Sequence, residues 1–68
     1  MRDVAVSTDS IRLGQFLKLA GVVDVGSDVR SLLGDGRVRV NGGAEDRRGT
    51  QLVRGDIVTV DDTELRVG

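Results

Sequence analysis

Apolar residues recur at helical spacing in the first third of the chain and predict a helix that ends at Gly21. The inward positions are Leu13, Phe16, Leu17 and Ala20. Side-chain oxygens at positions 8–10 are candidates for its N-cap. Arg12, Gln15 and Lys18 are spaced three apart on the opposite arc. The helix therefore has a core face and a polar, basic face.

Gly14 interrupts this helix and costs roughly 1 kcal/mol relative to alanine. Two interpretations remain open. The glycine either permits another backbone to approach closely or is a weak point of the helix.

A second, shorter helix is predicted from Ser27 to Leu33. Ser27 is its expected cap, and its apolar positions are Val29, Leu32 and Leu33. Arg30 points away from them. Gly34 and Gly36 supply the permissive backbone for a turn into a strand.

Apolar residues alternate with polar ones after these helices, which predicts strands. In the first strand, Val38 and Val40 face one side while Arg37, Arg39 and Asn41 face the other. We expect a turn at residues 42–43 and a partner strand over 44–48. Further strands follow at 57–60 and around 65–67, joined by turns at 54–56 and 61–62. The fold class is α+β, with two or three short helices packed on a small, mostly antiparallel sheet.

With 68 residues, the chain forms one domain at most, spanning 1–68. The absence of cysteine and histidine removes disulfides, thiolate metal sites and the commonest general base. No spacing gives the serines a base, so we expect neither enzymatic activity nor a cofactor. The apolar runs fall short of the roughly 20 residues that a bilayer span needs. We expect a cytoplasmic protein without membrane contact.

The formal net charge is −1, but the charges are unevenly distributed. Residues 11–55 contain eight basic and five acidic residues, whereas residues 1–10 and 56–68 are both acidic overall. Nine of the ten basic residues are arginine, whose planar fork binds phosphate in a bidentate way. Genomic base composition also favours arginine. A basic centre between acidic flanks indicates a polyanionic partner.

The only aromatic residue is Phe16, and its spacing places it in the core. No ring is left to stack on unpaired bases, so a partner recognised by phosphate positions and shape is favoured. Folded, partly duplex RNA meets this description.

The chain resembles the small stand-alone RNA-binding proteins with the alpha-L motif, first named from the fourth small-subunit ribosomal protein. The resemblance covers about residues 9–60 and rests on Ile11, Leu13, Gly14, Gln15, Phe16, Leu17, Lys18, Gly26, Arg30, Gly36, Val38, Val40, Asn41, Gly42, Glu45, Arg47, Arg48, Gly49, Leu52, Gly55 and Asp56. The run from Arg47 to Gly49 resembles the short bacterial subgroup.

The resemblance implies non-catalytic binding of structured RNA, either ribosomal or transfer RNA, by a monomer that associates with ribosomal particles. The expected contact residues are Arg12, Gln15, Lys18, Ser27, Arg30, Arg37, Arg39, Asn41, Arg47 and Arg48. Asp28 departs from a uniformly basic surface. The alternatives are a ubiquitin-like carrier, a protein-interaction module, or a structural or regulatory subunit on the ribosome.

Overall fold

The structure is a computed structural model that describes residues 1–68. It contains two helices, α1 (Leu13–Leu19) and α2 (Gly26–Gly34). The strands are β1 (Arg2–Val4), β2 (Ser10–Arg12), β3 (Val38–Val40), β4 (Gly43–Ala44), β5 (Gln51–Val53), β6 (Ile57–Val60) and β7 (Thr63–Val67). No helix is long and apolar enough to cross a bilayer.

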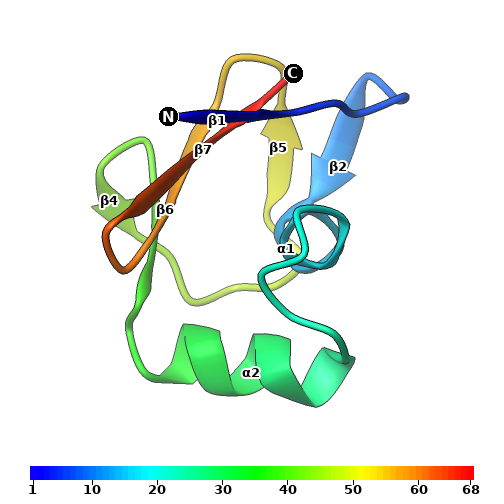
Figure 1. Ribbon diagram of the computed structural model, residues 1–68. Coiled ribbons are helices and arrows are strands. Elements are labelled where there is room, and N and C mark those ends of the chain that lie inside the picture. Colours follow the sequence, from blue (N-terminus) through cyan, green and yellow to red (C-terminus); the bar gives the residue numbers. More distant parts are fainter.

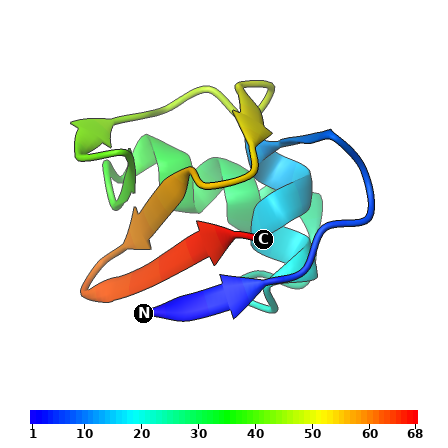
Figure 2. The same cartoon turned by 90° about the horizontal axis from the view of Figure 1, so that it is seen from above.

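Five of the strands form one sheet in the order β1-β7-β6-β3-β4 (Figure 1). All neighbours are antiparallel except β1 and β7, which run parallel. The first and last strands of the chain therefore lie side by side, as Figure 2 also shows. The sequence did not predict β1, β2 or β5. The α+β class with a mostly antiparallel sheet is confirmed.

Both helices cover the same face of this sheet (Figure 2). Alternation along the strands directs Val58, Val60, Leu65 and Val67 to that face, where they meet the apolar sides of the helices. Phe16 is fully buried there. No polar side chain is buried, so the core depends on apolar packing alone.

A two-stranded sheet of β2 and β5 leads directly into α1. The expected N-cap at residues 8–10 is wrong, because Ser10 pairs with Val53 in this sheet. Backbone carbonyls from a distant segment cap the helix instead. Thr50 O accepts a hydrogen bond from the Leu13 N–H (2.8 Å), and Arg48 O accepts one from the Gly14 N–H (2.9 Å).

The second helix begins one residue earlier than predicted, at Gly26. Val25 occupies the N-cap position, and no side chain caps the helix. Ser27 therefore lies inside the first turn, and its predicted capping role is wrong.

The hairpin after β3 turns at Asn41 and Gly42, one residue before the predicted turn. Both residues have positive φ (52° and 86°), as a tight two-residue hairpin turn requires. The partner strand is β4, which covers Gly43 and Ala44 rather than residues 44–48. The chain from 45 to 50 is thereby free to run back to α1.

Candidate nucleic-acid interface

Three of the ten basic residues are paired with carboxylates: Arg37 with Asp61, Arg54 with Asp9, and Arg66 with Asp3. The other seven have no acidic partner within salt-bridge distance: Arg2, Arg12, Lys18, Arg30, Arg39, Arg47 and Arg48. These unpaired cations are the groups available to an anionic ligand.

A groove of about 290 Å³ lies between α1 and the loop at residues 47–49, and none of its lining residues is hydrophobic. We refer to it as the basic groove, lined by Arg12, Gly14, Gln15, Lys18, Arg48 and Gly49. It contains three unpaired cations and no carboxylate. The polar arc predicted for the first helix is therefore one wall of the groove.

Gly14 brings the other wall close to the helix. Its N–H donates to Arg48 O, and a methyl group at this position would lie 3.5 Å from Arg48 Cβ, Arg48 O and Val29 Cγ1. Another backbone does approach here, but at an ordinary contact distance that leaves room for a methyl group, so both interpretations of this glycine stay open. Larger side chains would push the loop away, so the glycine helps to define the groove's width.

Arg48 extends from the groove to the start of α2. A Cβ added at Gly26 would lie 3.6 Å from the Arg48 Nη2 and 4.0 Å from its Nη1. The guanidinium thus sits beside the N-terminal end of a helix, where the macrodipole is positive. Two positive features adjoin here, which favours an anion. The sequence predicts an anion site at the N–H groups of residues 26–28, where this helix begins, but it did not place Gly49 among the contact residues.

The two flanks of α2 carry opposite charges. At about 100° per residue, Arg30 projects only about 40° from Gly26 around the helix axis, whereas Asp28 projects about 200° from it. Arg30 and Gly26 therefore lie on the flank toward Arg48. Asp28 lies on the opposite flank and lines a different hollow, described below. The acidic residue that departed from the basic pattern is thus turned away from the basic groove.

Ser27 and Arg47 are the sequence neighbours of Gly26 and Arg48. Ser27 is exposed in the first turn of α2, next to Gly26. Arg47 is exposed, and its backbone N–H donates to Glu45 Oε1 (3.0 Å). This hydrogen bond is the main reason that the pKa of Glu45 lies below its ordinary value.

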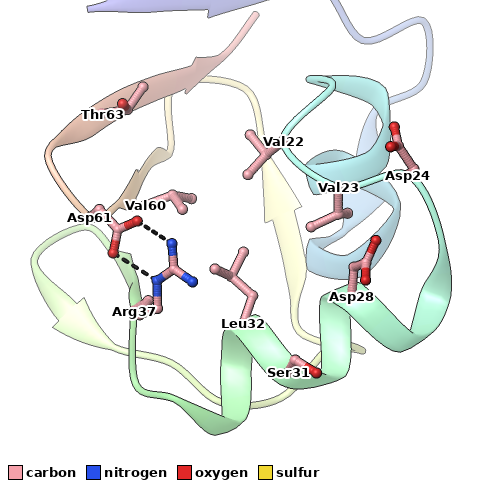
Figure 3. A pocket seen from close by; sticks show the side chains of 10 residues that line it. All are labelled: Val22, Val23, Asp24, Asp28, Ser31, Leu32, Arg37, Val60, Asp61 and Thr63. Atoms are coloured by element: carbon pink, nitrogen blue, oxygen red, sulfur yellow. Dashed lines mark hydrogen bonds and ion pairs between the residues drawn. The ribbon is translucent and has the colours of Figure 1, made fainter.

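Arg37 lies elsewhere, in a hollow on the Asp28 flank of α2 (Figure 3). Its guanidinium forms a bidentate pair with Asp61, with Nε 2.9 Å from Oδ1. Hydrogen bonding to Arg37 holds the pKa of Asp61 below its ordinary value. Asp24 and Asp28 line the same hollow. The charge of Arg37 is compensated, and its surroundings are acidic.

Arg39 and Asn41 also lie apart from the groove. In register with Thr59 and Ala44, Arg39 projects from the sheet face that the helices leave uncovered. The Asn41 side chain is occupied within the fold, because its Oδ1 accepts from the Ile57 N–H (2.9 Å) and its Nδ2 donates to Asp56 Oδ1 (3.2 Å). The structure therefore gathers Arg12, Gln15, Lys18 and Arg48 in the groove, with Ser27, Arg30 and Arg47 beside it.

Two helices on one face of a mostly antiparallel sheet, with unpaired cations along the outer side of the first helix, form the arrangement expected of an alpha-L domain. The S4 domain model matches residues 4–68, and the chain belongs to this family of ribosome-related RNA-binding domains. The resemblance noted in the sequence is confirmed.

Two similar proteins extend this identification. The chain is 40% identical over 58 residues to the "Probable ribosome maturation protein RlbA" of Bacillus subtilis (strain 168), covering 85% of this chain and 82% of that protein. The crystal structure of the 30S ribosomal protein S4e from Thermoplasma acidophilum shares the fold, with a TM-score of 0.66 at 19% identity. That match covers 88% of this chain, which spans about a third (32%) of the larger protein.

Proposed function

We propose that this protein binds structured RNA, ribosomal or transfer RNA, by placing backbone phosphates in the basic groove, without catalysing a reaction. The observation that carries the proposal is the grouping of Arg12, Lys18 and Arg48 around one groove without an acidic partner. Arginine and lysine at such positions bind phosphate regardless of base sequence. Similarity to a ribosome maturation protein favours a ribosomal RNA target.

The number of unpaired cations at the surface determines how steeply RNA affinity should fall with salt. Arg30 and Arg47 bring the unpaired cations in and beside the groove to five. If about four to six phosphates are neutralised, log affinity against log salt has a slope of about −3 to −5. A titration from 50 to 200 mM salt, followed by anisotropy of a labelled RNA hairpin, measures this slope. A flat titration contradicts the proposal.

Variants that each remove one positive charge test whether RNA binds at the basic groove. Arg48→Gln and Lys18→Gln each remove one positive charge from the basic groove, and each is expected to weaken binding and make the slope shallower by about 1. Arg2→Gln is the matched control, because Arg2 is also exposed and unpaired but lies at the start of the edge strand β1. Equal losses in all three variants would indicate binding by overall charge, which contradicts a role for the groove.

The carrier alternative gains no support from the structure. The activated glycine of a carrier has to extend away from its domain, whereas the Gly68 N–H donates to Val4 O (2.9 Å) and Gly68 O accepts from the Val6 N–H (3.1 Å). Gly68 is thus integrated into the sheet. Crosslinking in cells, with sequencing of the recovered RNA, separates direct RNA binding from a purely protein-mediated place on the ribosome.

A further inference from the structure

A second hollow, of about 540 Å³, borders the basic groove on the other side of α1. It is shallow and open to solvent, and we refer to it as the apolar cleft. Val6, Ile11 and Leu19 supply its apolar surface, Ser7 contributes a hydroxyl group, and Gln15 and Lys18 line both the cleft and the groove. A ligand that fills the groove therefore reaches the cleft across two shared side chains.

Leu19 gives the cleft its most exposed apolar surface. It ends α1 on the side away from the core, and 53% of the residue is exposed to solvent. A single exposed leucine is ordinary on a protein surface. Here, however, Leu19 lies in a concavity with two further aliphatic side chains, next to an unpaired lysine.

The chain between β1 and β2 forms the opposite wall of the cleft. Contacts with Arg54 hold this segment in place. Arg54 Nη2 donates to Val6 O (3.2 Å), and Arg54 Nη1 lies 3.6 Å from Asp9 Oδ1. The Thr8 hydroxyl donates to Ser10 O (2.6 Å). Arg54 therefore supports this segment of the chain through contacts within the protein. These contacts preform the cleft, which lowers the entropic cost of filling it.

We infer that the apolar cleft receives one unstacked nucleobase of the RNA whose phosphates occupy the basic groove. This inference rests on the proposed function and narrows the ligand to a duplex with one unpaired nucleotide, whose base leaves the helix when the RNA binds. A nucleotide combines a base with apolar faces and an anionic phosphate. The two hollows match this combination, because the cleft offers aliphatic side chains, the groove offers cations, and Lys18 lines both. A purely apolar peptide would leave this charge without a partner.

The aliphatic nature of the cleft agrees with the composition of the chain. Its single aromatic residue, Phe16, is fully buried, so no ring can form a stacking platform. An extrahelical base instead packs against leucine and isoleucine, while Ser7 and Gln15 offer hydrogen bonds to its edge. Aliphatic contact provides weaker discrimination than aromatic stacking, so we expect a modest preference.

Two RNA hairpins that differ by one unpaired nucleotide test the inference. The wild type is expected to bind the bulged hairpin about fivefold more tightly than the fully paired one. Leu19→Gln removes the apolar surface at little cost in helix propensity and should abolish this preference while leaving affinity for the paired hairpin unchanged. Val53→Thr is the matched control because Val53 is also half exposed (52%) but lies outside the cleft, and it should retain the preference.

Fluorescence of 2-aminopurine at the bulged position supplies a second readout. Its emission should rise on binding, because the base leaves the stacked helix and meets no aromatic side chain that would quench it. Leu19→Gln should reduce this rise, and Val53→Thr should not.

Failure of this inference is distinguishable from failure of the proposed function. Equal affinity for both hairpins, with Lys18→Gln weakening both, would overturn the base site and leave RNA binding intact. A bulge preference that Leu19→Gln does not change would place the base elsewhere and also overturn it. Absence of salt-dependent binding to either hairpin would overturn both proposals.

Discussion

Gly14 determines how closely the 47–49 loop packs on α1, so replacing it tests the physical origin of the basic groove. Its φ is not positive, and an added methyl group would meet Arg48 and Val29 atoms at 3.5 Å, an ordinary contact distance. Alanine also restricts the unfolded chain more than glycine does. We expect Gly14→Ala to raise the free energy of unfolding by about 0.5 kcal/mol and to leave RNA affinity unchanged.

Gly14→Val should have the opposite effect. Its γ carbons would extend beyond Cβ into atoms that already lie 3.5 Å from that Cβ. Overpacking of this kind costs about 1–3 kcal/mol, and displacement of the loop also weakens the 2.9 Å hydrogen bond to Arg48 O, which is worth about 1 kcal/mol. The net destabilisation should be about 2 kcal/mol or more, with weaker RNA binding because Arg48 moves with the loop.

Urea unfolding followed by far-ultraviolet circular dichroism measures both effects, since the chain has no tryptophan or tyrosine to report by fluorescence. For a domain of this size, each 1 kcal/mol also shifts Tm by about 4–8 °C. The reasoning is refuted if the two variants have equal stability, because the loop would then not be seated against α1. If Gly14→Ala instead loses stability, a methyl group does not fit at the 3.5 Å contact distances on which the prediction rests.

Three further outcomes follow from particular contacts. Asn41→Ala should destabilise the fold about 1 kcal/mol more than Asn41→Gly does. Both variants lose the same side-chain hydrogen bonds, but only alanine is strained by the positive φ of this position. Equal urea midpoints for the two variants would contradict this. The depressed pKa of Asp61 means that its pair with Arg37 stabilises the fold above the unfolded-state pKa of about 4 and loses this effect as pH falls through the lower folded pKa. The difference in urea midpoint between wild type and Asp61→Asn should therefore be constant near neutral pH and shrink below about pH 4, and a gap that persists in acid would argue against the pair. Asp24→Asn, on the acidic flank, should raise the RNA association rate at about 0.01 M salt but hardly at 0.15 M, where the Debye length is only about 8 Å; a large effect at both salt concentrations would mean that Asp24 lies near the bound RNA.

The two helices and the strands β3, β6 and β7 could be predicted because their signals are local. The spacing of Leu13, Phe16 and Leu17 and the alternation of Val38 and Val40 depend only on neighbouring residues, and each pattern formed the expected element. The start of α1 could not be predicted in this way. Ser10 has good N-cap chemistry, yet pairing with Val53, 43 positions away in the sequence, takes the segment into a strand.

The contrast between local patterns and long-range contacts also explains which site residues could be predicted. Arg12, Gln15 and Lys18 occur on one helical face by spacing alone, and the structure keeps them in one groove. Whether an arginine is free depends instead on its partner in space. Arg37 and Asp61 are 24 positions apart, and Arg66 and Asp3 are 63 apart, so no local pattern reveals that these guanidinium groups are neutralised.

Net charge is therefore a poor guide to whether this protein can bind RNA. The value of −1 is a sum over a molecule of 26 × 22 × 18 Å, whereas screening at physiological salt limits electrostatic attraction to about 8 Å. Within that range, a phosphate in the basic groove meets Arg12, Lys18 and Arg48, while Asp24 and Asp28 lie on the far flank of α2. The two helices separate the charges that the sequence sums together, and we expect the local surplus of cations to determine the interaction with a polyanion.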